Sequence, residues 1–141
     1  MSAPGRYDYA ELVAALWKLG APGERMPTSH GILDEALKRI IDQPSFPSKL
    51  RNGLTFGDTS VGLRCFELPD ILLAAQDALL TSEPNPTYLS TEVTLDEESA
   101  RQIVVGLGLS TRDARDLGRD LSEAAMEIRQ RSLRGDPMVA A

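Results

Sequence analysis

One segment in the middle of the chain is apolar around almost its whole circumference when it is drawn as a helix. It begins at Pro69, a residue that suits the first position of a helix, and runs to about Thr81. Only Asp70, Gln76 and Asp77 interrupt a set of apolar side chains, which are Ile71, Leu72, Leu73, Ala74, Ala75, Ala78, Leu79 and Leu80. A helix that is apolar on all sides is normally buried, so we expect this one to be the centre of the core.

Apolar residues at helical spacing predict four further helices, two on each side of this segment. Each begins near a residue that suits a helix start and ends near a glycine, a proline or the end of the apolar pattern. The first two are Tyr7–Leu19 and a helix from Thr28 or Ser29 to about Asp42. The third begins at a capping box of Thr94 and Glu97 and ends at Gly106 and Gly108, and the fourth runs from Ser110 to about Ser132.

Two short runs rich in β-forming residues lie between the second and the central helix. They are 54–56 and 61–66, and the turn signals near them are Asn52-Gly53 and Gly57-Asp58. They predict a small hairpin, and the β-rich segment 88–95 is a candidate third strand that pairs with it. The expected fold is therefore α+β and mainly α, with about five helices and an antiparallel element of two or three short strands.

The strongest break in the chain is Pro84-Asn85-Pro86. It suggests a proline-rich connector at 83–87 between an N-terminal helical lobe with its hairpin, 7–82, and a strand with a helical hairpin, 88–134. The ends, 1–6 and 135–141, read as flexible tails. We expect the two lobes to form one compact domain.

Composition narrows the classes of partner and compartment. The chain has 15 basic and 21 acidic residues, a net charge of −6, which disfavours nonspecific binding to nucleic acid or anionic lipid. No apolar run has the ~18 residues of a membrane span. The single cysteine, Cys65, excludes an intramolecular disulfide and fits a reducing compartment, so we expect a cytoplasmic protein, and the Arg- and Ala-rich usage suggests a bacterial one.

The most specific local pattern is 96–121, where two helices meet at Gly-Leu-Gly-Leu-Ser as in a helix-turn-helix. In this interpretation Arg112, Arg115 and Arg119 on one helix face would contact phosphates. The acidic residues that alternate with them oppose it, and so does the charge from Glu83 onward, 7 basic against 11 acidic residues, net −4. The alternative is a plain αα-hairpin with a solvated face of Arg–Asp pairs.

Catalytic groups are sparse. His30 has Ser29 beside it and Asp34 one helical turn on, and Cys65 could in principle pair with it. Ser29 is better explained as a helix cap, and Cys65 lies among apolar neighbours, which indicates a buried inert thiol. We therefore expect no enzymatic activity, no cofactor and no metal site.

By elimination, the sequence favours a non-catalytic protein-interaction or regulatory module, with the helix-turn-helix regulator as the alternative and an enzyme using His30 as a distant third. Trp17 is a candidate contact residue, although core packing is the simpler explanation. The apolar stripe of the last helix is longer than its hairpin partner, so Leu121, Ala125 and Ile128 must pack on the first half of the chain or on another subunit. A homodimer is one possible outcome.

Overall fold

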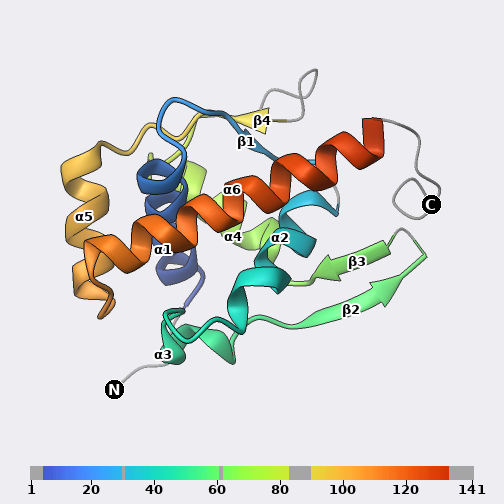
Figure 1. Cartoon of the computed structure of the whole chain (residues 1–141), viewed down its shortest axis with the longest axis horizontal. Helices are drawn as coiled ribbons and strands as arrows, with labels where there is room; N and C mark the ends of the chain where they lie inside the picture. The colour runs from blue at the N-terminus through green and yellow to red at the C-terminus, as the bar shows by residue number, and fades with distance from the viewer. Residues whose placement is uncertain (1–4, 30, 61, 83–89, 134–141) are drawn as a thin grey trace.

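A computed structural model describes residues 5–29, 31–60, 62–82 and 90–133. Over these residues the chain forms six helices and two small antiparallel sheets (Figure 1), which confirms the predicted mainly helical α+β class. In chain order the elements are α1 (Arg6–Gly20), β1 (Met26–Pro27), α2 (Ile32–Ile41), α3 (Ser48–Arg51), β2 (Phe56–Thr59), β3 (Gly62–Cys65), α4 (Leu68–Asp77), β4 (Ser90–Thr91), α5 (Glu97–Gly106) and α6 (Thr111–Leu133).

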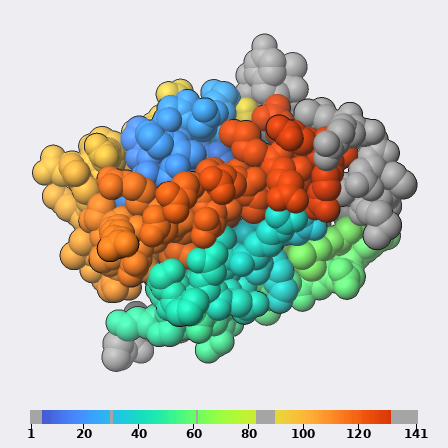
Figure 2. Space-filling view, in the orientation of Figure 1, coloured from blue at the N-terminus to red at the C-terminus, as the bar shows by residue number. Residues whose placement is uncertain are grey.

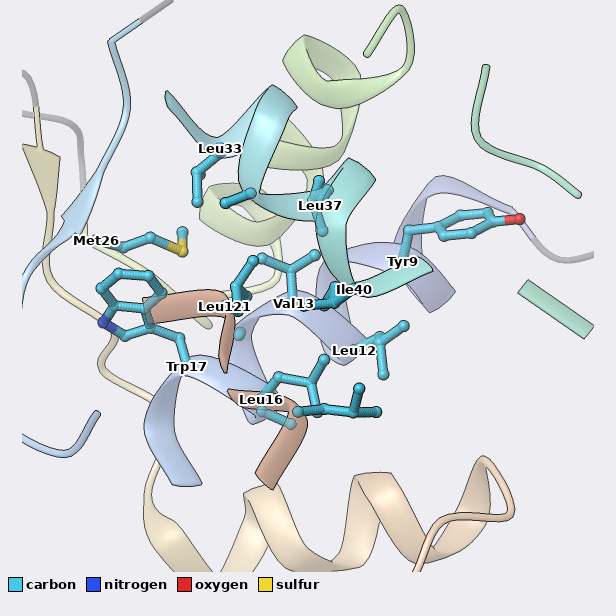
Figure 3. Packing of buried hydrophobic residues seen from close by; sticks show 14 of the residues in the cluster. Tyr9, Leu12, Val13, Leu16, Trp17, Met26, Leu33, Leu37, Ile40 and Leu121 are labelled. Atoms are coloured by element: carbon cyan, nitrogen blue, oxygen red, sulfur yellow. The ribbon is translucent and has the colours of Figure 1, made fainter. Parts of the chain in front are cut away.

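The centre of the core is α1. It packs against α4, α5 and α6, so its side chains are covered on nearly every side. Leu16 and Trp17 are fully buried, and the Trp17 ring lies beside Met26 (Figure 3). The indole Nε1–H donates to the Glu24 carbonyl at 2.9 Å, so the one polar atom of the ring is satisfied.

Helix α6 crosses α1 at two glycines, Gly20 and Gly118. A Cβ on Gly20 would overlap the backbone of Gly118, and a Cβ on Gly118 would overlap the Leu16 carbonyl. The two backbones therefore touch at the crossing with no side chain between them. Beyond it, α6 runs across the face shown in Figure 2, with α1 along one side and α2 and α3 along the other.

The expectation that the 69–81 segment is the centre of the core is wrong. Its helix, α4, ends at Asp77, and only one side of it, which includes Ile71, Ala74 and Ala75, is buried. Leu73 is 54% exposed and Leu79 is 81% exposed. The physical reason is that α1 takes the central place, and α4 covers one side of it as an outer helix.

The predicted hairpin is confirmed, since β2 and β3 pair antiparallel with Phe56 opposite Cys65 and Thr59 opposite Gly62, but its first strand begins at Phe56, where the predicted run 54–56 ends. Gly57 and Asp58 lie within β2 and do not form the turn. The expected third strand does not join this sheet. Instead β4 pairs with β1, where Arg25 donates from Nε to the Ser90 hydroxyl at 2.9 Å and from Nη2 to the Ser90 carbonyl at 3.1 Å.

The chain segments on either side of 83–89 are joined to each other directly. Thr81 and Val93 form an antiparallel bridge, and the Ser82 N–H donates to the Glu92 carbonyl at 2.8 Å. The Thr94 N–H donates to the Leu80 carbonyl at 3.0 Å. The connector 83–87 itself lies outside the described residues, as do most of the two expected tails.

Two of the predicted helix caps are wrong. Helix α2 begins after Gly31, whose N–H donates to Asp34 Oδ2 at 3.1 Å, and neither Thr28 nor Ser29 caps it. Helix α5 is capped by Asp96, which accepts the Ser99 N–H at 2.6 Å, so the Thr94 capping box does not form. The Ser110 cap of α6 is confirmed, because its hydroxyl accepts the Asp113 N–H at 3.0 Å.

The contact at Gly20 and Gly118 makes a specific prediction about stability. Gly118→Ala should lower the free energy of unfolding by about 1–3 kcal/mol or more, because its methyl group forces α1 and α6 apart. Gly106→Ala is the matched control: this glycine, the last residue of α5, has open space at the Cβ position, so the change should not lower stability and should raise it by at most about 0.5 kcal/mol. Urea unfolding followed by circular dichroism measures both, and equal midpoints for the two variants would contradict the crossing.

Candidate functional site

Large apolar side chains are exposed on α4 and at both of its ends. We call this surface the α4 outer face and define it by Phe66, Pro69, Leu72, Leu73 and Leu79. Phe66 is 58% exposed, Leu73 54% and Leu79 81%, whereas Leu72 is half-buried. Elsewhere in the described part of the chain, the exposed large apolar residues are Tyr7, Val105 and Met126, which lie on three different helices. Scattered single residues of that kind are ordinary on a protein surface, but several on and beside one helix indicate a contact surface.

Phe66 lies just before α4, two residues ahead of its first residue, Leu68. Glu67 between them already has helical backbone angles. The Phe66 ring reaches back to Gly57 in β2, where a Cβ would come within 2.9 Å of it. The α4 outer face is therefore continuous with the base of the hairpin.

Leu79 has an unusual backbone. Its φ is 63°, which makes it the single non-glycine residue with positive φ in the described part of the chain. The Leu79 N–H donates to the Gln76 carbonyl at 3.0 Å and the Leu80 N–H to the Ala75 carbonyl at 2.9 Å, the two bonds of a Schellman motif. Leu79 thus occupies the position at a helix end that glycine usually takes. A branched residue there is strained by about 1–2 kcal/mol, and an 81% exposed side chain gains little packing in return.

A small groove borders the α4 outer face on the side of Pro69 and Leu72. It has a volume of about 120 Å³, and its other walls include Leu33, Leu68 and Arg64. Small-molecule sites are usually ~300 Å³ or larger, so this groove suits one side chain of a larger partner better than a separate ligand.

The polar residues at the bottom of this groove hold the fold together. Asp34 is almost completely buried, and its Oδ1 accepts the Cys65 N–H at 2.6 Å and Arg64 Nε at 3.2 Å. Its Oδ2 accepts the Gly31 N–H. One carboxylate therefore joins the start of α2 to β3, and both of its oxygens accept hydrogen bonds.

Cys65 is buried, and burial raises the pKa of its thiol to about 12, so the thiol is neutral near pH 7. Its Sγ lies 3.8 Å from Glu67 Oε1, and Glu67 in turn accepts hydrogen bonds from the Thr55 N–H and hydroxyl. His30 lies outside the described residues, so neither the thiol–imidazole pair nor the arrangement with Ser29 and Asp34 is placed by the structure.

The four residues predicted as contact residues lie in the interior. Trp17, Leu121 and Ala125 are fully buried, and Ile128 is 2% exposed. Helices α1 and α2 cover the apolar stripe of α6 within the same chain, so this stripe offers no surface to a second subunit. The sequence showed that the stripe needed a cover but not which helix provides it.

The three arginines predicted for nucleic-acid contact are exposed on α6. Arg119 Nη2 lies 3.2 Å from Asp116 Oδ1, and Arg115 Nη2 lies 3.9 Å from Glu97 Oε1. Two of the three positive charges therefore have a carboxylate beside them, the pattern of a solvated face of ion pairs. Helix α5 packs chiefly on α1.

Comparison of the chain with protein-family models, curated proteins and solved structures found no match. Within the described ranges, no helix is long and apolar enough to span a membrane. The same residues include no group of three His, Cys, Asp or Glu side chains placed to hold a metal ion.

The strained leucine predicts an unusual response to mutation. Leu79→Gly should raise the free energy of unfolding by about 0.5–1 kcal/mol, because relief of the left-handed conformation exceeds the entropy that glycine loses on folding. Leu79→Ala is the control, since it removes most of the side chain but keeps the strain, and should stay within about 0.5 kcal/mol of the wild type. A loss of stability in the glycine variant, measured by urea unfolding, would contradict the assignment.

Because the Cys65 thiol is buried, we expect it to react slowly with alkylating reagents. With the pKa of Cys65 raised to about 12, the native protein should react with iodoacetamide at pH 8 far more slowly than the protein in urea, because the thiolate is the reactive form. The alkylated fraction can be followed by mass spectrometry. Equal rates in the native and unfolded protein would show that the thiol is accessible and ionised.

Proposed function

We propose that this chain is a non-catalytic protein-interaction module and that its partner binds over the α4 outer face. The observation that carries the proposal is the exposure of three large apolar side chains on and beside one helix: Leu73 lies in α4, Phe66 two residues before it and Leu79 two residues after it. Burying these side chains against a partner would supply the apolar centre that specific interfaces have.

The backbone of Leu79 supports the same surface. Natural proteins keep strained or destabilising residues mostly where function requires them. Glycine would fit this position better, and the leucine side chain points largely into solvent. A contact with a partner gives that side chain a role that it lacks within the chain.

The buried polar groups also support a binding role over a catalytic one. Asp34 is engaged by two backbone N–H groups and by Arg64, and Glu67 is engaged by Thr55. The Cys65 thiol is neutral at physiological pH because burial raises its pKa to about 12. These groups serve the fold and are not presented to a substrate.

Site-specific photo-crosslinking tests the proposal. A benzophenone amino acid replaces Leu73 in one variant and Val105 in another; both positions are more than half exposed on helices, and Val105 on α5 is the control. In cells of the native host we expect a discrete crosslinked partner from position 73 and none from position 105. Crosslinking at 105 but not at 73, or the same products from both, would refute the α4 outer face as the contact surface.

A further inference from the structure

The α4 outer face lies in a part of the chain that has no positive charge. Residues 65–100 contain no Lys, Arg or His, and they contain eight carboxylates, namely Glu67, Asp70, Asp77, Glu83, Glu92, Asp96, Glu97 and Glu98. Two of these, Asp70 and Asp77, are exposed on α4 itself. Neither forms an ion pair with a described residue, whereas Glu35 on α2 and Asp116 and Glu127 on α6 do.

The positions of the two carboxylates relate directly to the exposed Leu73. Asp70 and Asp77 are seven residues apart, so they lie on one side of α4, next to Leu73. The half-buried Leu72 and the small groove lie on the other side of Leu73. The surface thus has an acidic edge on one side of Leu73 and a groove on the other, and the positive charge in the groove wall, Arg64, is paired with Asp34 at 3.2 Å.

We propose, resting on the function proposed above, that the segment bound at the α4 outer face is a basic amphipathic helix of a partner protein. Apolar side chains at every third or fourth position would cover Phe66, Leu73 and Leu79, and one of them would enter the groove beside Leu72. Lysine or arginine on one edge of the same helix would meet Asp70 and Asp77. Complementary charge of this kind selects the partner and its orientation more than it adds affinity.

The same charges disfavour the other occupants of an apolar face. A second copy of the chain carries the same net charge of −6, and a two-fold contact through this surface would bring its acidic edges into the same interface. Anionic lipid and nucleic acid would be repelled by Asp70 and Asp77 and by the net charge of −6. The observations therefore single out a cationic protein segment.

Binding of two synthetic helices tests the proposal. Both have about 18 residues, or five turns, with leucine at the same helical spacing; the polar positions are lysine in one peptide and glutamate in the other. Fluorescence anisotropy with the intact chain should show binding of the lysine peptide, weakening with added salt, and much weaker binding of the glutamate peptide. Leu79→Gly and Leu73→Ser should reduce binding of the lysine peptide.

A matched pair of double variants separates a specific site from general attraction. Asp70→Asn with Asp77→Asn should weaken binding of the lysine peptide about fivefold. Asp113→Asn with Glu123→Gln removes the same charge from exposed positions on α6 and should leave the affinity unchanged.

Three results would overturn the proposal: equal binding of the two peptides, equal weakening by the two double variants, or no binding of either peptide. A dimer in light scattering that Leu73→Ser dissociates would replace the partner helix by a second copy. If a crosslinked partner forms at position 73 while the peptides bind equally, the interaction module stands and the basic helix is refuted. If neither the crosslinking nor the peptide experiment shows binding at α4, both the interaction module and the basic helix are refuted.

Discussion

The contact between Gly20 and Gly118 is the constraint on which the rest of the fold depends. Two helices that meet without side chains approach more closely than helices separated by leucine or valine, and the contact then fixes where each residue further along must lie. Because α6 is 23 residues long, a crossing near its first third directs the remainder toward α2. The apolar stripe from Leu121 to Ile128 is buried for that reason. The first and second halves of the chain consequently contribute to one hydrophobic cluster.

The unusual surface follows from the same arrangement. Helix α1 has neighbours in α4, α5 and α6, so each of these helices has one side on α1 and one side directed outward. For α5 and α6 the outward side is mostly polar, as is usual for surface helices. For α4 the outward side keeps Leu73; Phe66 and Leu79 are exposed at the two ends of the helix, and no described element covers these three side chains. Helix α4 therefore has the apolar composition of a buried helix, but the folded chain covers only one side of it.

Much of this fold could be predicted from the sequence, because local rules determine it. Helical spacing identified the five longer helices, and β-forming runs identified the hairpin, although the four-residue α3 carried too weak a pattern. The central helix was assigned wrongly because periodicity shows which side chains are apolar and not what covers them. The pairing of β4 with β1 depends on two-residue strands held by Arg25 and Ser90, 65 residues apart, and no local pattern encodes that.

The candidate site was missed because the sequence pattern placed Leu73 and Leu79 in the core. The absence of any basic residue from 65 to 100 was the signal that could have drawn attention to this surface.

The hydrogen bonds that join the two sides of the proline-rich connector have an evolutionary consequence. Because Ser82 bonds to Glu92 and Leu80 bonds to Thr94, the ends of segment 83–89 are held by the folded part of the chain, whatever lies between them. The entropy of closing a loop rises only slowly with its length, by about 0.6 kcal/mol for each doubling. This point is therefore a natural place for insertions, and a lineage could lengthen the segment, or graft a second domain into it, while the packing around α1 stays the same.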